Sequence, residues 1–229
     1  MSAIPYPIRR SGRARRARIH VSADGVEVVL PRGLPLREVE PFVEEKRRWI
    51  ERTLRRIREA QAEQPPPLIV DGGEVPYLGE RLALRVRVEP GRRRSHVARR
   101  DAALHVAVGA PGPEPLRDAL ERWYRRRARI EVKRRLDAAA LGAGRTYSSL
   151  QIRGQRTRWA SCSSTGAMSF NWRLLLAPAA MLDYVVDHEV AHLEVHDHSD
   201  RFWSLLARRC PDYEQHEAWL RRHGQSLRL

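Results

Sequence analysis

The sequence predicts an α+β fold, in which helical and strand-like segments follow one another without an internal repeat. Apolar residues recur at three- and four-residue spacing over residues 36–63 and 116–141, which is typical of amphipathic helices. Apolar and polar residues alternate over residues 82–88 and 104–108, which is typical of strands with one exposed face. At 229 residues, the chain can bury a core in one large domain or two small ones.

The first half is predicted to contain a hairpin, a helix and a sheet. Asp24-Gly25, between strand-like residues 18–21 and 26–30, is a strong hairpin turn signal. A helix over residues 36–63 follows, and the proline-rich run 64–67 ends it as a short, stiff connector. Residues 68–108 are then predicted to form a half-exposed antiparallel sheet.

The second half is predicted to be mainly helical. A long helix is expected over residues 116–141, and Gly142-Ala143-Gly144 ends it. Residues 150–152 and 168–174 are predicted as strands around a loop at residues 161–166. Pro178 suits the first turn of the next helix and Pro211 that of the last one.

The charge of the chain permits two interpretations. With 43 Lys and Arg against 28 Asp and Glu, the formal charge is +15, which suggests an anionic partner such as nucleic acid. Only Lys46 and Lys133 are lysines, and this bias towards arginine is also typical of a GC-rich genome, an explanation that requires no partner. Basic runs are scattered, and aromatic residues do not alternate with them as a stacking platform requires. We therefore expect only weak, sequence-independent nucleic-acid binding. The runs lie at residues 9–18, 92–94, 99–100 and 122–135.

Other features favour a cytoplasmic protein. No apolar stretch is long enough for a membrane span, and no apolar segment follows a basic start as in a secretory signal. The two cysteines, Cys162 and Cys210, do not make a disulfide framework. No membrane partner is therefore expected, and the sequence does not indicate an oligomeric state.

The segment His188-Glu189-Val190-Ala191-His192 contains most of a zinc-hydrolase site. On a helix, positions 188 and 192 lie one turn apart on one face, so both imidazoles can reach one ion while Glu189 lies beside them. Catalytic zinc usually takes three protein ligands and leaves one position to water. This arrangement predicts a zincin-like core, with the HExxH helix packed on a small antiparallel sheet.

Two histidines compete for the place of the third ligand. His196 continues the helical stripe, but it would stand about 12 Å from His188 along the axis, too far for ligands at about 2.0–2.1 Å from one ion. His198 can return to the metal if the helix ends near His196 and the chain turns at Asp197. Ser199 supports such a turn as the N-cap of a following helix. The predicted zinc ligands are His188, His192 and His198, with Asp197 as the alternative third ligand.

Glu189 is the predicted general base, because a carboxylate one residue beyond the first ligand can accept the proton of a zinc-activated water. Tyr184 either bonds to the substrate or packs in the core. Arg158 and Arg173 bind an anion or make ordinary ion pairs. Cys162 is predicted to be a small buried side chain, and His216 and His223 lack a ligand partner at useful spacing. Trp159, Trp172, Phe202 and Trp203 are expected to form core around the site.

Further motifs surround this site in a fixed order: RWASC at 158–162, FNWRLLLAP at 170–178, DYVVDHE at 183–189, DHS at 197–199 and FW at 202–203. Together they resemble the YgjP-like metallopeptidase family, whose pattern runs RWGSC, NWRL, AP, DYV, HELxHL, NHS, FW. The resemblance is densest over residues 157–206 and extends over about 13–225. It implies a zincin-type zinc hydrolase, related in its metal-binding helix to SprT-like and Wss-like proteases that act on DNA-bound proteins.

The resemblance also implies site residues and domain limits. His188, His192 and His198 match the family's zinc ligands, and Glu189 matches its general base. The chain departs from the pattern at Ala160, Val190 and Asp197, none of which removes a ligand or the base. We expect a basic tail over residues 1–12 and one domain over 13–229. This domain would comprise an N-terminal α/β subregion over 13–115 and a zinc-binding catalytic core over 116–229.

Three functions remain possible, and the first is favoured. The chain is predicted to be a zinc metallopeptidase that cuts peptides or proteins, with Zn²⁺ as its cofactor. The same site could hydrolyse a nucleotide phosphoanhydride, although no phosphate-binding loop of the GxxxxGK[ST] type is present. It could also serve a nucleic-acid-associated, SprT-like protease. A non-enzymatic module with a structural metal is disfavoured, because structural zinc normally takes four ligands.

Overall fold

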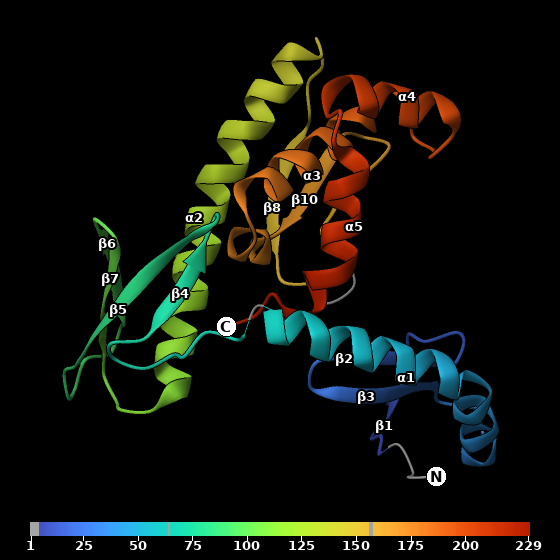
Figure 1. Cartoon of the computed structure of the whole chain (residues 1–229), viewed down its shortest axis with the longest axis horizontal. Coiled ribbons are helices and arrows are strands. Elements are labelled where there is room, and N and C mark those ends of the chain that lie inside the picture. The colour runs from blue at the N-terminus through green and yellow to red at the C-terminus, as the bar shows by residue number, and fades with distance from the viewer. Residues whose placement is uncertain (1–4, 64, 156–157) are drawn as a thin grey trace. The chain divides into compact units, whose positions relative to one another are not determined.

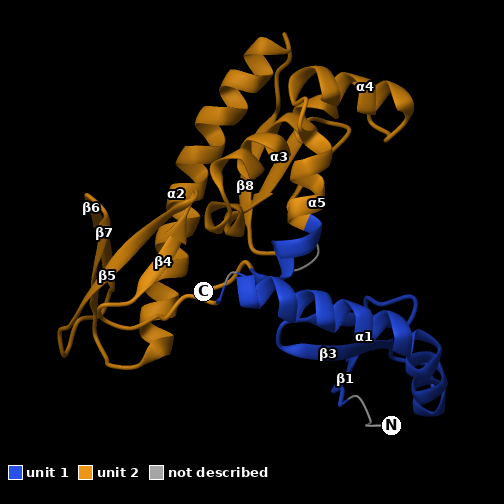
Figure 2. Ribbon diagram, in the orientation of Figure 1, with its two compact units in different colours: residues 1–65, 221–226 blue, residues 66–220, 227–229 orange. Residues whose placement is uncertain are grey.

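The computed structural model describes residues 5–63, 65–155 and 158–229. Gln64 of the predicted connector and residues 1–4 of the predicted tail lie outside the described residues. The chain divides into unit 1, residues 1–65 and 221–226, and unit 2, residues 66–220 and 227–229 (Figure 2). Both units combine helices with small sheets (Figure 1), so the predicted α+β class is confirmed.

Unit 1 consists of a three-stranded sheet and a long helix. Strands β2 (Arg18–Ser22) and β3 (Gly25–Pro31) form the predicted hairpin, in which Gly25 adopts a φ of 121° that favours glycine. Strand β1 (Ile8–Ser11), which falls in the predicted tail, pairs in parallel with β3. After the 3₁₀ turn η1 (Leu36–Glu38), helix α1 (Val39–Glu63) runs as predicted. A small core joins the sheet to the helix through the buried residues Val26, Val28, Leu30, Val39, Val43 and Ile50.

The first sheet of unit 2 has the order β4-β5-β7-β6. Its strands are β4 (Glu74–Tyr77), β5 (Glu80–Val88), β6 (His96–Arg100) and β7 (Ala103–Val108). The expected alternation is present, since Leu82 and Leu84 are fully buried while Arg85 is exposed. The prediction of an antiparallel sheet is wrong for its centre, where β5 and β7 run parallel. β6, which lies between these two strands in the chain, occupies the edge of the sheet and pairs antiparallel with β7, so β7 runs parallel to β5.

A second sheet in unit 2 lies close to the HExxH helix. It has the order β8-β10-β9, with strands β8 (Ser149–Arg153), β9 (Ala160–Cys162) and β10 (Ala167–Asn171). This sheet is also mixed rather than antiparallel, because β10 pairs in parallel with β8 and antiparallel with β9. β9 occupies residues partly predicted as a loop, since three residues are too few to show an alternating pattern.

The remaining elements of unit 2 are helical. They are α2 (Pro113–Gly142), the 3₁₀ turn η2 (Trp172–Leu176), α3 (Ala179–Ala191) and α4 (Asp200–Arg209). Helix α5 (Tyr213–His223) and the 3₁₀ turn η3 (Gly224–Ser226) cross into unit 1. Residues 172–174, predicted as the end of a strand, are helical because the Asn171 side chain accepts a bond of 3.1 Å from the Arg173 amide and caps the turn.

In the core of unit 2, α3 packs against both α2 and the second sheet. Tyr124, Phe170, Trp172, Leu182 and Val186 are each at most 2% exposed, and each such burial contributes about 1.5–3 kcal/mol. At the edge of this core, Arg135 of α2 donates bonds of 2.7 Å to Asp183 of α3 and of 2.6 Å to Glu131. Packing and these ion pairs together fix the position of the HExxH helix.

The chain passes from one unit to the other after residues 65, 220 and 226. The predicted subregions 13–115 and 116–229 stay a prediction. No helix among the described residues is both long and apolar enough to cross a membrane.

Candidate functional site

The HExxH segment lies at the C-terminal end of α3. The helix ends at Ala191 with His192 as its C-cap, so the prediction that it continues to about His196 is wrong. The chain instead makes a tight turn, in which the Val195 amide bonds to the Ala191 carbonyl at 3.0 Å. This turn brings the Val195 carbonyl to 3.0 Å from Nδ1 of His192. The early helix end thus provides a hydrogen-bond partner for the second histidine.

Three imidazoles converge beyond this turn. His188, His192 and His198 each offer a ring nitrogen within 4.8 Å of the others, the only such group of His, Cys, Asp or Glu in the part of the chain that the structure describes. Nε2 of His188 and Nε2 of His198 are 3.2 Å apart. The ring centroids are separated by 4.7–5.2 Å. The structure therefore brings all three predicted ligands together.

The turn at Asp197 explains how His198 reaches the group. The Asp197 carboxylate accepts a bond of 3.1 Å from the Ser199 amide, and Ser199 is the N-cap of α4, as predicted. The Ser199 side chain makes no capping bond, so the aspartate holds the turn instead. Neither Asp197 nor His196 belongs to the histidine group.

Phe202 of α4 packs against all three imidazoles. Its ring centroid lies 4.5 Å from that of His192, 4.8 Å from that of His198 and 4.9 Å from that of His188. The side chain is fully buried, which agrees with its prediction as core around the site. The aromatic contact fixes the rings in place and covers one side of the group.

Glu189 is a buried carboxylate, 6% exposed. Burial raises its pKa to about 7, and a hydrogen bond from the backbone amide of Cys162 opposes this rise. Atom Oε2 of Glu189 is buried without a hydrogen-bond partner among the described residues. The contact with β9 was not predicted, because a backbone donor leaves no trace in the side-chain pattern. The amide from β9 thus orients one carboxylate oxygen of Glu189, and the other oxygen is available as an acceptor.

Burial favours the neutral form of two of the histidines, His188 and His192. Burial, together with the nearby His192 and His198, lowers the pKa of His188 to about 3. Burial also lowers the pKa of His192. Neutral imidazole is the form that ligates metals, so the site is suited electrostatically to a cation.

The other residues singled out in the sequence lie around this group. Tyr184 is 6% exposed and its ring is 6.0 Å from that of His188, so it packs in the core as one interpretation predicted. Cys162 is only partly buried. The Arg173 guanidinium lies 4.6 Å over the Trp172 ring and bonds to the Gly154 carbonyl, while Arg158 is exposed. None of these side chains joins the histidine group.

His216 and His223 also lie outside the group. The Nδ1 atom of His216 is 3.4 Å from Sγ of Cys210, and Nε2 of His223 is 3.7 Å from Glu63.

Comparison with known proteins identifies the family. The model of the YgjP-like metallopeptidase domain matches residues 15–223, which confirms the resemblance seen in the motifs. The crystal structure of the metallopeptidase zymogen of Methanocaldococcus jannaschii jannalysin is 18% identical, with a TM-score of 0.34, over 38% of this chain and 94% of that one. That of the Pyrococcus abyssi abylysin zymogen is 23% identical, with a TM-score of 0.34, over 40% and 96%. No curated protein matches the chain.

Proposed function

Because the chain belongs to the YgjP-like metallopeptidase family, we propose that it is a zinc-dependent peptidase with His188, His192 and His198 as ligands. The observation that carries this proposal is the convergence of three imidazole nitrogens within 4.8 Å. A buried carboxylate, Glu189, follows the first of them directly in the chain. Peptides or proteins are the substrates that the family implies.

The donor set fits zinc. Two ligands about 2.0–2.1 Å from one tetrahedral ion stand roughly 3.3–3.4 Å apart, and the Nε2 atoms of His188 and His198 are 3.2 Å apart. The Val195 carbonyl can only accept, so its contact with Nδ1 of His192 places the hydrogen there and leaves Nε2 with a free lone pair. Three neutral nitrogen ligands suit a borderline-soft ion and leave a coordination position open, which favours a catalytic over a structural role.

The residues of the chain have separable roles in the proposed reaction. Bound zinc supplies a Lewis acid that activates water and polarises the scissile carbonyl. Glu189 accepts the proton of the attacking water and returns it to the leaving amine, and its Oε2 atom, which has no hydrogen-bond partner among the described residues, is available for this role. The Cys162 amide orients this carboxylate, and Phe202 holds the imidazoles and excludes water from one side.

We also propose a cytoplasmic location, because Cys162 and Cys210 are both free and structural disulfides are typical of oxidising compartments. The histidine group and Glu189 do not by themselves distinguish a general peptidase from nucleotide hydrolysis or a SprT-like mode.

The test compares three preparations: the zinc-loaded protein, the protein stripped with a chelator, and the stripped protein after zinc is restored. Each is incubated with a denatured protein mixture and, separately, with a nucleotide panel. We expect new amino termini from the protein mixture, lost on stripping and regained with zinc, and no phosphate release. Phosphate release without proteolysis would overturn the peptidase proposal in favour of phosphoanhydride hydrolysis.

A further inference from the structure

One face of α1 carries an exposed basic stripe that contains a tryptophan. The basic stripe comprises Arg48, Trp49, Arg52, Arg55 and Arg56. Arg55 and Arg56 lie three and four residues after Arg52, which itself lies four residues after Arg48, so the arginines follow one side of the helix over about 12 Å. All four are exposed, and the Trp49 side chain is 43% exposed. The opposite side of α1 buries Val43 and Ile50 against the sheet of unit 1.

The arginines of the stripe have no acidic partner among the described residues. Elsewhere in α1, Arg47 pairs with Glu44 at 2.7 Å and Lys46 pairs with Glu45 at 2.6 Å. Most basic residues of α2 are also paired with carboxylates of their own unit, as in Arg117, Arg125, Arg127, Lys133, Arg134 and Arg135. Four positive charges therefore remain unneutralised on one short surface of α1.

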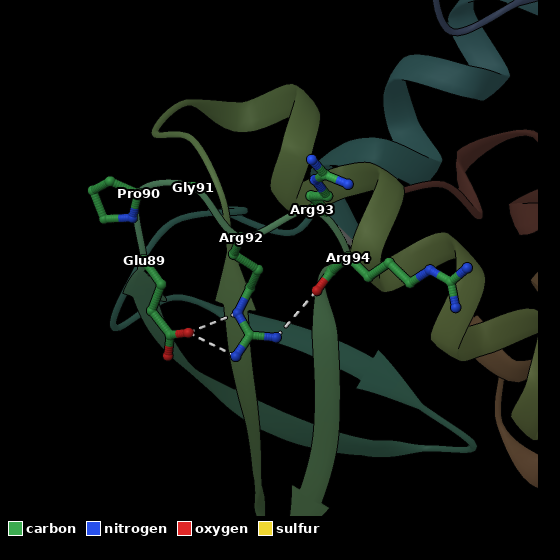
Figure 3. A pocket seen from close by; sticks show the side chains of 6 residues that line it. All are labelled: Glu89, Pro90, Gly91, Arg92, Arg93 and Arg94. Carbon is green, nitrogen blue, oxygen red and sulfur yellow. Dashed lines mark hydrogen bonds and ion pairs between the residues drawn. The ribbon is translucent and has the colours of Figure 1, made fainter.

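Trp49 distinguishes this surface from other basic surfaces of the chain. No ring contact involves it among the described residues, so a face of the indole is available. It lies one turn from Arg52 and two turns from Arg56. The exposed face of β5, β6 and β7 also carries unpaired arginines, Arg85, Arg87 and Arg100, but beside them lie alanines and the imidazoles of His96 and His105, and no indole or phenyl ring. The β5–β6 loop, whose Arg92 pairs with Glu89 (Figure 3), has no aromatic side chain.

We propose that the basic stripe binds single-stranded nucleic acid. Guanidinium groups donate paired bonds to phosphate oxygens, and an exposed indole stacks on an unpaired base whatever its identity. Single strands offer both groups at once, whereas the bases of a duplex are already stacked on one another. A membrane surface fits less well, because the apolar side of α1 is occupied by its own sheet. Glu45 and Glu59 bound the stripe, so the site is about two helical turns long.

The experiment measures binding of a fluorescent oligothymidylate 20-mer to the zinc-loaded full chain by anisotropy, over a series of salt concentrations. In the stripe variant, Arg48, Arg52, Arg55 and Arg56 are each changed to Gln. In the matched control, Arg85, Arg87, Arg100 and Arg122 are changed to Gln. These control residues are exposed, have no acidic partner among the described residues and belong to unit 2. The control therefore carries the same net charge as the stripe variant.

We expect the stripe variant to lose most of its affinity and the control to keep it. Each neutralised phosphate contributes about 0.7 to the slope of log K against log salt. The slope should therefore fall by about 2.8 if all four arginines reach phosphates. Equal losses in the two variants would overturn the proposal, because binding would then follow total charge.

Substitutions of Trp49 provide the second part of the binding experiment. Trp49→Ala should weaken oligothymidylate binding at least about 5-fold, whereas Trp49→Tyr should restore it, because each base–aromatic stack contributes measurably. Binding to a duplex of the same length should not respond to Trp49→Ala. An unchanged affinity in Trp49→Ala, or tighter binding to phosphatidylserine vesicles than to the oligonucleotide, would overturn the single-strand assignment. Circular dichroism and metal content confirm that each variant is folded.

This binding should be the same in Glu189→Gln as in the wild-type chain. The nucleic-acid inference and the peptidase proposal can therefore fail independently.

Discussion

The two units hold their positive charge in different ways. Unit 1 has 17 Lys and Arg against 9 Asp and Glu in 71 residues, and unit 2 has 26 against 19 in 158 residues. In unit 2, ion pairs tie arginines to the core, and Arg135 joins α2 to the histidine helix. In unit 1, α1 leaves four arginines exposed beside a tryptophan. A net charge of +15 thus combines arginines that hold structure together with arginines available to a partner.

The two units also differ in the chemistry of their candidate sites. The histidine group lies wholly in unit 2, where burial lowers the pKa of His188 and His192 and favours their neutral form. The basic stripe lies wholly in unit 1 and is exposed. If this contrast is correct, changes in one unit should leave the property of the other untouched.

Loss of a histidine should have the largest effect. His188→Ala, His192→Ala and His198→Ala should each lose nearly all bound zinc, because two remaining imidazoles hold the ion far more weakly. Elemental analysis of the purified proteins measures the occupancy. Oligothymidylate binding by unit 1 should not change in any of them.

His196→Ala is the matched control, since His196 is exposed and lies outside the histidine group. It should keep its zinc. Full occupancy in His198→Ala together with loss of metal in Asp197→Ala would show that Asp197 is the third ligand.

The ion-pair network of α2 should show the next largest effect. Glu131 is 14% exposed and accepts bonds from Arg135, Arg127 and Tyr77. Burial alone would raise its pKa, but the bonds from Arg135 and its other partners leave it lowered. Glu131→Gln should therefore reduce the free energy of unfolding at pH 7 by about 1–3 kcal/mol.

The pH dependence gives the sign of this effect. A lowered pKa in the folded state stabilises the fold above the unfolded carboxyl pKa, about 4.3, and this stabilisation is lost as pH falls through the folded value. The difference between wild type and Glu131→Gln should thus shrink in acid. Urea unfolding from pH 7 downwards measures it, with the exposed Glu59→Gln of α1 as control. A difference that stays constant or grows in acid would contradict the network.

The basic stripe should have the smallest effect on stability. Because its arginines are exposed and unpaired, the fourfold Gln variant should change the free energy of unfolding by less than about 0.5 kcal/mol. Arg135→Gln, which removes bonds to Glu131 and Asp183, should cost more. If the stripe variant were the less stable of the two in urea unfolding, the contrast between the units would be wrong.

The site could be predicted from the sequence because its parts are local. His188 and His192 are set by helical spacing, and Ser199 marks the next helix. The end of α3 could not be predicted, since it depends on the Val195 carbonyl meeting His192 across a turn without glycine. The hydrogen bond from the Cys162 amide to Glu189 could not be predicted either, because the pairing of β9 with β10 places that amide.

The helices and hairpin followed from local patterns, whereas the direction of strand pairing did not. Leu82 and Leu84 show the same alternation in a parallel as in an antiparallel sheet. The pattern therefore does not indicate which strand pairs with β5, or in which direction. The basic stripe could not be predicted for a similar reason. Helical spacing places Arg48, Arg52 and Arg56 on one side of α1, but only the structure shows which arginines have an acidic partner and which do not.

The central claim is that Glu189 acts as the base of a zinc peptidase, and Glu189→Gln tests it most directly. The amide matches the shape of the carboxylate but cannot take the proton. The variant should therefore keep its zinc and its melting temperature, while turnover of denatured protein falls by about 10²–10⁴-fold. Elemental analysis, thermal unfolding and the release of new amino termini measure these three properties on one preparation. Turnover close to that of the wild type, with zinc fully bound, would contradict the account.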